Sequence, residues 1–178
     1  MRFAVILAIF STFSITAHAE KSAFTMGPVF EKFGPVADVD ADFEIPEGTQ
    51  LRVSFDVAKG ADQGDLNKTL VTAARFINMH VRAGVPLEDI DVAVAVHGKA
   101  ILDVTKASKY DEEIGGENAN AELVSALTKK GVRIIVCGQS SASQGIKKAD
   151  LLPGVEVAVS ALTVHAVLLR NGYTLNPF

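Results

Sequence analysis

The sequence is poor in the residue types that most often carry chemistry or cross-links. It has one cysteine, Cys137, two tyrosines and no tryptophan among 178 residues. A single cysteine excludes an internal disulfide, and no pair of its four histidines has metal-ligand spacing, so we expect no metal site. Neither a Gly-x-Gly-x-x-Gly motif after the first expected strand nor a Gly-Lys-Ser/Thr phosphate loop is present. We therefore expect no nucleotide and no other cofactor.

Positive charge is also scarce. The chain has 17 Lys and Arg against 21 Asp and Glu, a formal net charge of −4, and no basic run. A mildly acidic chain of this kind is a poor partner for nucleic acid or for anionic membranes. Beyond the N-terminus, no segment has the uninterrupted apolar length of a membrane span.

The N-terminus has the features of a secretory signal peptide. Met1-Arg2 precedes an apolar run from Phe3 to Ile15, and Ala17-His18-Ala19 has the small-x-small form of a cleavage site. The alternative is an uncleaved anchor, for which the run is too short and wrongly flanked. We predict a signal peptide over residues 1–19, cleaved after Ala19. The mature protein would then be periplasmic or secreted, with no membrane attachment.

Strand and helix patterns alternate from residue 51 onwards. Alternating or continuous apolar runs predict strands over 51–57, 90–96, 132–136 and 155–159, with a short fifth over 173–175. Helical spacing predicts helices over 66–81, around 123–127 and over 162–170. Asp62 or Asp65 is expected to cap the first helix and Asn120 the second. Residues 103–118 predict a loop or a short broken helix. This order favours a mainly parallel sheet with helices on both faces in an α/β domain over residues 51–178.

Residues 20–50 differ from the rest of the chain. They hold three prolines and follow no regular period. Their phenylalanines are apolar anchors that a disordered tail would not need: Phe24, Phe30, Phe33 and Phe43. We expect this N-terminal extension to pack across the domain or onto a neighbouring subunit.

Cys137 directly follows the strand predicted over 132–136. In parallel α/β sheets, reactive groups collect beyond the carboxyl ends of the strands. A helix that starts near Ser140 or Ser141 would place Cys137 close to its N-terminus, where a thiolate is favoured. The alternative is a buried structural cysteine, because free cysteine is among the most buried residue types. Position alone leaves both interpretations open.

His97 follows another predicted strand, 90–96, in the same way. If the two strands are near each other, His97 and Cys137 face one crevice, where an imidazole could stabilise a thiolate or handle its proton. The alternative is that His97-Gly98 is only a tight turn. His80 and His165 fall within predicted helices, and we expect both to be partly buried structural histidines.

Several segments together resemble the DsrE/DsrF-like family, and most closely its exported branch. They are His97 to Ala100, Asn118 to Asn120, Gly131 to Ser140, Asp150 to Val155, Ser160 to Thr163 and Gly172 to Leu175. The resemblance covers about residues 50–178 in collinear order. It implies a three-layer α/β sandwich with a five-stranded sheet, commonly assembled into trimers or hexamers. In the sulfur-relay members, a cysteine at the position of Cys137 carries sulfur as a persulfide and passes it on.

The resemblance assigns candidate roles by position. It implies that Cys137 carries the sulfur and that Gly138, Gln139 and Ser140 form its loop. We expect the backbone N–H groups of this loop to bind the substrate by holding the outer sulfur. We add His97 as a candidate catalytic residue and Gly98 as a substrate-binding one. Two functions remain. The first is an exported sulfane-sulfur carrier or transferase, a homo-oligomer with a sulfur donor or acceptor protein as partner. The second is a non-catalytic oligomer that binds a small ligand or senses thiol redox state.

Overall fold

The computed structural model describes residues 23–176, so the predicted signal peptide and its cleavage site lie outside the described residues. These residues form a five-stranded sheet in the order β4-β3-β2-β1-β5. Its strands are β1 (Leu51–Val57), β2 (Ile90–Val96), β3 (Arg133–Cys137), β4 (Val155–Ala158) and β5 (Thr174–Asn176). All four pairings are parallel. The α/β architecture predicted from the alternating pattern is confirmed, and the sheet is parallel throughout.

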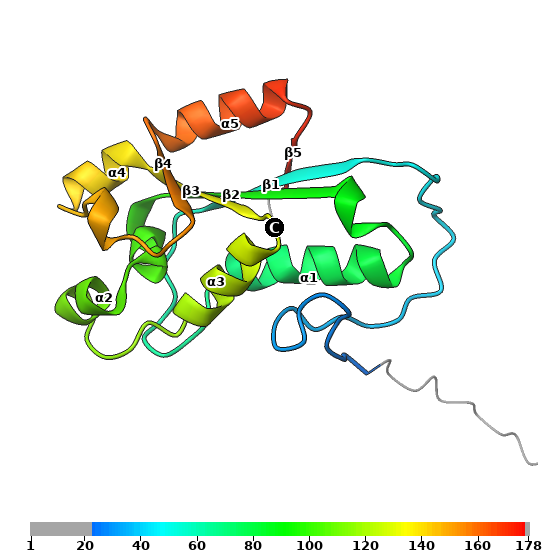
Figure 1. The fold of residues 1–178 in the computed structure, drawn as a ribbon, viewed down its shortest axis with the longest axis horizontal. Coiled ribbons are helices and arrows are strands. Elements are labelled where there is room, and N and C mark those ends of the chain that lie inside the picture. The colour runs from blue at the N-terminus through cyan, green and yellow to red at the C-terminus, as the bar shows by residue number, and fades with distance from the viewer. Residues whose placement is uncertain (1–22, 177–178) are drawn as a thin grey trace, which may run out of the picture.

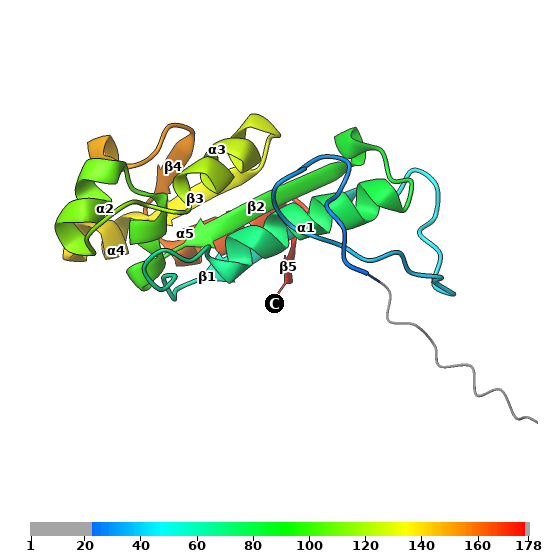
Figure 2. The same cartoon turned by 90° about the horizontal axis from the view of Figure 1, so that it is seen from below.

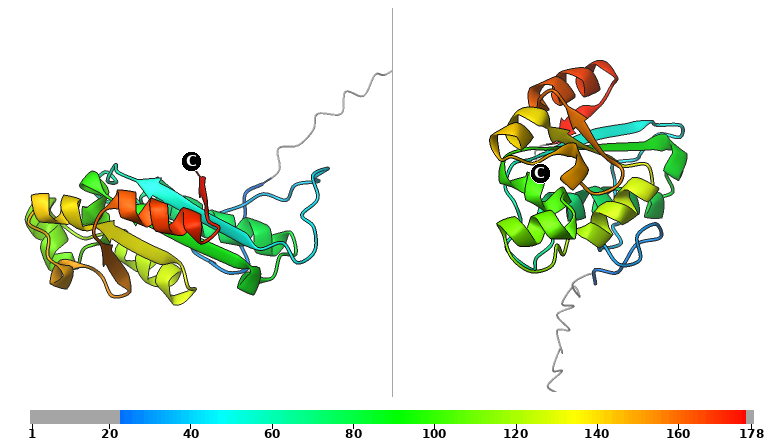
Figure 3. Two further views of the ribbon diagram at one scale, coloured as in Figure 1. Left: turned by 90° about the horizontal axis from the view of Figure 1, so that it is seen from above. Right: turned by 60° about the vertical axis from the view of Figure 1, so that its left-hand side comes forward.

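Helices cover the two faces of this sheet unequally. Two long helices, α1 (Lys68–Arg82) and α3 (Ala121–Lys129), lie together on one face, and α5 (Ala161–Arg170) lies on the other (Figure 1). Figure 3 shows α5 from above, running across the outside of the sheet. Short helices fill the connections: η1 (Leu87–Asp89), η2 (Gly98–Val104), α2 (Ala107–Glu113), α4 (Gly138–Ser143) and η3 (Lys148–Asp150). None of the helices between residues 23 and 176 is long and apolar enough to cross a membrane.

The hydrophobic core is split by the sheet into a large and a small part. On the α1 and α3 side, Phe55, Val94 and Ile134 from three neighbouring strands are completely buried. On the α5 side the cluster is small: Ala93, Ala95, Ile135, Val164 and Leu168. The alanines of β2 leave room for α5 to approach the sheet. Because β2 is buried on both faces, it has the continuous apolar run that parallel central strands require.

One of the two predicted helix caps differs in the structure. Asn67, rather than Asp62 or Asp65, caps α1, because its side chain accepts a hydrogen bond from the Thr69 N–H at 3.0 Å. Asn120 is the N-cap residue of α3, as predicted, but its side chain makes no capping hydrogen bond and its oxygen accepts from the Asn67 N–H at 2.7 Å. Asn67 Nδ2 also donates to buried Asp103 at 2.7 Å. The contacts of Asn67 with Asn120 and Asp103 join residues far apart in sequence, which local pattern does not reveal.

Residues 103–118, predicted as a loop or a short broken helix, hold the end of η2 and one short helix, α2. One residue, His97, separates β2 from the 3₁₀ helix η2, which begins at Gly98, and α2 follows from Ala107. Asn118 then donates through Nδ2 to the carbonyls of Asp103 and Thr105, at 3.1 and 2.8 Å. Buried side-chain amides therefore hold this connection in place of a regular apolar face.

One buried side chain ties the N-terminal extension to α1. Asn78 is completely buried, and its Oδ1 accepts from the N–H groups of Val29 and Phe30 at 3.2 and 2.9 Å. Its Nδ2 donates to the carbonyls of Phe30, Phe33 and Gly34 at 3.1, 2.9 and 3.0 Å. Figure 2 shows this part of the chain looped across α1. A single amide thus satisfies five backbone groups of a segment with little regular structure.

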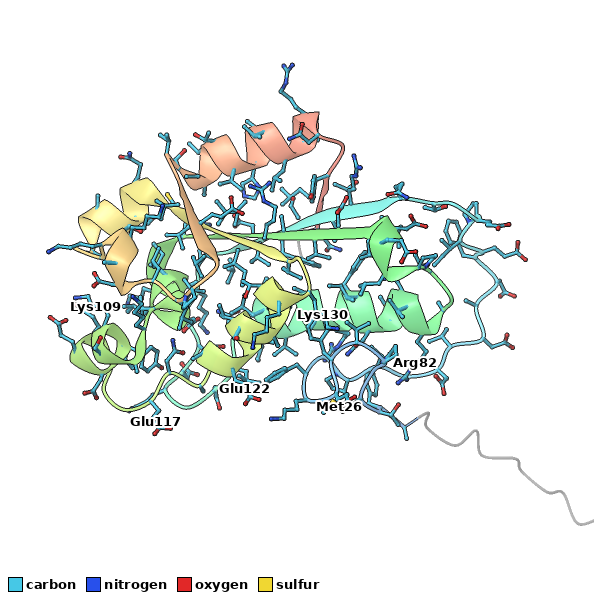
Figure 4. The ribbon with its side chains drawn as sticks, in the orientation of Figure 1. Met26, Arg82, Lys109, Glu117, Glu122 and Lys130 are labelled. Atoms are coloured by element: carbon cyan, nitrogen blue, oxygen red, sulfur yellow. The ribbon has the colours of Figure 1, made fainter. Side chains whose placement is uncertain are left out.

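Arg82, in the last turn of α1, also binds the N-terminal extension. It donates to the carbonyls of Met26 and Val36 at 2.7 and 3.0 Å (Figure 4). Of the four phenylalanines expected to be anchors, Phe30 is buried and Phe33 packs against the core. Phe24 and Phe43 are 65% and 89% exposed in the single chain. The expectation of four buried anchors therefore holds for only two within this chain.

Candidate functional site

Cys137 lies where β3 turns into a helix. It is the last residue of β3 and the N-cap of α4, and only 5% of its surface is exposed. The helix was predicted to start near Ser140 or Ser141, but it starts at Gly138. The cysteine therefore immediately precedes the first turn. Glycine is required there because a Cβ at position 138 would lie 2.6 Å from the carbonyl oxygen of Ala158. The close approach of the end of β4 therefore shapes the Cys137 turn.

The surroundings of the Cys137 sulfur favour a thiolate. Burial raises the pKa of the thiol, but hydrogen bonds from the Ser140 hydroxyl and from the N–H groups of Ser140, Ala161 and Gln139 outweigh it. The net effect is a pKa below the ordinary cysteine value. Ala161 is the first residue of α5, so these donors come from the starts of two helices. Helix N-termini present free N–H groups and partial positive charge, which stabilise an anion.

A carboxylate links two histidines at the same edge of the sheet. Asp56 Oδ2 lies 3.0 Å from His97 Nε2, and Asp56 Oδ1 lies 2.7 Å from His165 Nε2. Burial raises the pKa of Asp56, and the hydrogen bonds and positive charge of His97 and His165 lower it more strongly, so its net pKa is below the ordinary value. An ionised Asp56 accepts from both rings. Each ring then donates through Nε2, and Nδ1 is an acceptor atom when the ring is in its neutral form.

These four residues line one pocket. Asp56, His97, Cys137 and His165 surround a cavity of about 660 Å³. The rest of its wall comes from Gln139, Ser160, Ala161, Leu162 and Leu175. The pocket combines a thiol, two imidazoles and a carboxylate with an apolar rim. This set of groups suits nucleophilic chemistry at sulfur with nearby proton acceptors.

The structure brings some of the predicted site residues into this pocket. β2 and β3 are neighbours, which places His97 and Cys137 at one pocket, with Gln139 beside them. Ser140 is not part of the pocket lining, but it donates hydrogen bonds to the Cys137 sulfur. Gly98 does not line the pocket; its φ of 52° forms the turn after β2, and its carbonyl accepts from Gln144 Nε2 at 2.9 Å. The functional roles of these residues remain predictions.

Two residues of the pocket were not found from the sequence. His165 was expected to be a structural histidine of an apolar helix, and Asp56 was not singled out. Asp56 lies one residue before the end of β1, so the strand-end argument used for His97 and Cys137 would have found it. His165 reaches the pocket only because α5 packs over the sheet. Among residues 23–176, no group of three or more His, Cys, Asp and Glu side chains is arranged to hold a metal ion.

The fold and the pocket define an α/β protein that presents a buried, low-pKa cysteine at the carboxyl edge of a parallel sheet. The family model of the DsrE/DsrF-like family matches residues 52–177. The chain therefore belongs to the DsrE/DsrF-like family, as the sequence resemblance indicated. No curated protein matches the chain.

Two solved structures are similar to this one. The first, MTH1491 from Methanobacterium thermoautotrophicum, is described as a protein of unknown function. It shares 21% identity over 72% of this chain and 99% of its own, with a TM-score of 0.53. The second is the ychN protein from E. coli, with 17% identity over 72% of this chain and 100% of its own, and a TM-score of 0.49. The first likeness supports the shared fold.

Proposed function

We propose that this protein is a sulfane-sulfur carrier or transferase that holds sulfur as a persulfide on Cys137. The observation that carries this proposal is the set of hydrogen-bond donors around the sulfur, from the starts of α4 and α5. They favour a thiolate, which is the nucleophilic form of cysteine. The DsrE-like family is generally linked to sulfur relay, which supports the same conclusion.

The proposed reaction is a redox-neutral exchange of sulfur–sulfur bonds. The Cys137 thiolate attacks a sulfane sulfur, a new S–S bond forms, and the old S–S bond breaks with its electron pair leaving on the donor. An acceptor thiolate later attacks the outer sulfur of the Cys137 persulfide and regenerates the Cys137 thiolate. His97 is the proposed proton acceptor for the thiol. Asp56 is the proposed positioning residue, because its carboxylate fixes the orientation of the ring.

Mass spectrometry of the intact protein tests this proposal. Incubation with inorganic polysulfide should add mass in whole sulfur atoms at Cys137, and a reductant should remove it. The Cys137→Ala variant should gain nothing. His97→Gln should slow the addition of sulfur to Cys137. His80→Gln is the control and should not slow it, because His80 lies outside this pocket and contacts the Phe76 carbonyl. An unmodified Cys137 under these conditions would refute the carrier function.

The burial of Cys137 favours a second candidate function. A thiol that is only 5% exposed offers limited access to a large partner, as expected of a small-ligand-binding or redox-sensing protein. In that case, Cys137 should stay free of added sulfur while a ligand in the pocket protects it from alkylation. The same mass measurement therefore separates the two functions.

We also propose that the protein acts as a homo-oligomer, a trimer or a hexamer, with α5 at the subunit boundary. Apolar side chains of α5 are exposed, including Leu162 at 82%, Leu169 at 70% and Val167 at 49%. Leu162 also lines the Cys137 pocket, so a neighbouring subunit on this surface would help to enclose it. Light scattering should show an oligomer that Leu169→Glu weakens. A clean monomer at micromolar concentration would contradict the proposal.

Export is the remaining part of the proposed function. With the signal peptide removed, the protein would work in the periplasm or outside the cell, with a sulfur donor or acceptor protein as its partner. N-terminal sequencing of protein from its native host should begin at Glu20. Retention of Met1 on cytoplasmic material would contradict export.

A further inference from the structure

His165 reaches the Cys137 pocket from α5, on the opposite face of the sheet from α1 and α3. It lies one turn after Ala161, whose N–H donates to the Cys137 sulfur. Residues four apart in a helix lie on the same face. Val164 and Leu168 are buried against the sheet and hold the helix there. The packing of α5 therefore sets the position of His165 together with that of a donor to the thiolate.

The two ring nitrogens of His165 are both closed to a reacting group in the pocket. Nε2 lies 2.7 Å from Asp56 Oδ1 and donates to it. Nδ1 is fully buried and has no hydrogen-bond partner among residues 23–176. His97 Nε2 also contacts Asp56, at 3.0 Å from Oδ2, but its Nδ1 is not among the fully buried atoms without a partner. Of the two rings, His97 therefore keeps the nitrogen that a reacting group can reach.

The Asp56 carboxylate depends on both histidines for its orientation. Its side chain is 39% exposed, so packing covers it only in part. Each oxygen has a different ring as its partner, Oδ2 with His97 and Oδ1 with His165. Hydrogen bonds to an ionised group are stronger than those between neutral groups. Rotation of the carboxylate would break the bond to His165, so that bond keeps Oδ2 directed at His97.

We propose that His165 is a positioning residue that acts through Asp56 on His97 and takes no part in proton transfer itself. This inference rests on the proposed function, in which His97 accepts the Cys137 proton. The proton leaves the Cys137 sulfur and is taken by His97 Nδ1, while the electron pair stays on the sulfur. A carboxylate that accepts from the other ring nitrogen orients the imidazole and stabilises its charged form. His165 holds that carboxylate in place.

The composition of the pocket leaves this role to His165. Four of the nine lining residues are titratable: Asp56, His97, Cys137 and His165. Among them, the two histidines are the hydrogen-bond partners of Asp56. Substitution of His165 by an apolar residue would therefore leave Asp56 Oδ1 without its donor and the carboxylate free to rotate.

The test compares variants that keep or lose the donor at position 165. Glutamine can donate to Asp56 through its own Nε2, whereas leucine cannot. The rate of sulfur addition to Cys137 from inorganic polysulfide is measured by intact mass on the wild type, His165→Gln and His165→Leu. His165→Leu is also combined with Asp56→Asn. His80→Leu is the matched control, because His80 lies in a helix but outside the pocket.

We expect His165→Leu to slow sulfur addition about tenfold and His165→Gln to recover at least about half of the wild-type rate. His80→Leu should keep the wild-type rate. In the Asp56→Asn background, His165→Leu should cause no further loss, because residues that act as one unit are not additive. Alkylation of Cys137 by iodoacetamide should also need a higher pH in His165→Leu, since a less stabilised His97 imidazolium takes the thiol proton less readily.

Two results would overturn the assignment. A His165→Gln rate below about a tenth of the wild-type rate would mean that the ring itself is needed, and this result does not depend on how well His165→Leu folds. Losses of His165→Leu and Asp56→Asn that multiply in the double variant would mean that His165 does not act through Asp56. Either result leaves the carrier function standing, because the wild type still adds sulfur. If the wild type adds none, both proposals are wrong.

Discussion

Replacement of Asn78 by alanine should loosen the N-terminal extension from the domain. The variant removes the five hydrogen bonds that the buried amide makes to the backbone of residues 29–34. It also leaves a space beside Gly27, where the backbone lies so close that a Cβ would fall 2.1 Å from Asn78 Cγ. The perturbed groups are mostly buried backbone N–H and carbonyl groups, which need partners.

The size of the effect follows from those bonds. A net contribution of about 1 kcal/mol for each hydrogen bond gives at most about 5 kcal/mol. Some backbone groups regain water when the segment moves, so we expect a loss of about 3–4 kcal/mol in the free energy of unfolding. If the segment detaches before the core unfolds, the loss equals the free energy of docking that segment. Asn78→Asp should lower the free energy of unfolding by at least as much, because a carboxylate oxygen would face the three carbonyls to which Nδ2 now donates.

Urea unfolding and limited proteolysis check this prediction together. Asn78→Ala should lower the unfolding midpoint and expose cleavage sites within residues 23–36. Asn171→Ala, at the exposed end of α5, is a control that should change stability by less than about 0.5 kcal/mol. A loss below about 1 kcal/mol in Asn78→Ala, without faster cleavage of the extension, would refute our account of how this segment is held.

Three further predictions concern the site. Ser140→Ala should raise the pKa of the Cys137 thiol, because it removes the hydroxyl donor; the pH dependence of alkylation should shift upward, and an unchanged profile would contradict this role. Gly138→Ala should destabilise the protein and slow Cys137 modification, since its Cβ would lie 2.6 Å from the Ala158 oxygen; wild-type melting and reactivity would argue against that contact. The third concerns acid. The pKa of Asp56 is lower in the folded than in the unfolded chain, so its stabilising contribution is complete above the unfolded pKa, about 4, and is lost as pH falls through the folded value. Asp56→Asn should therefore flatten the acid limb of the stability profile, and an identical limb would count against the histidine contacts.

The sequence predicted those parts of the fold that depend on local pattern. The apolar run of β2 follows from its burial on both faces, and the helical spacing of α1 follows from its burial on one face. Both elements lie where the patterns indicated. The positions of Cys137 and His97 followed from the rule that parallel strands end at a common edge. What local pattern could not supply was strand order. Strand order sets β2 between β1 and β3, which brings Asp56, His97 and Cys137 to one pocket.

Contacts between distant segments account for the other differences. His165 reaches Asp56 across 109 positions of sequence, and the Asn120 side chain accepts from the Asn67 N–H across 53. Each is a polar residue whose partner is chosen by tertiary packing, which overrides local capping preference. The exposed Phe24 and Phe43 show the converse: an apolar residue in an irregular segment does not by itself imply burial within the same chain.

The pairing of β5 with β1 has a consequence for the order in which the molecule is completed. The last strand of the chain lies beside the first, and Leu175 of β5 pairs with Ser54 while it lines the Cys137 pocket. A chain that emerges N-terminus first can build β1, β2 and β3 while this wall is still missing. Closure of so long a segment is slow compared with local helix formation. Cys137 therefore acquires its complete pocket only when the final residues have docked, so an unfinished or truncated chain would carry the thiol without the surroundings that select its substrate.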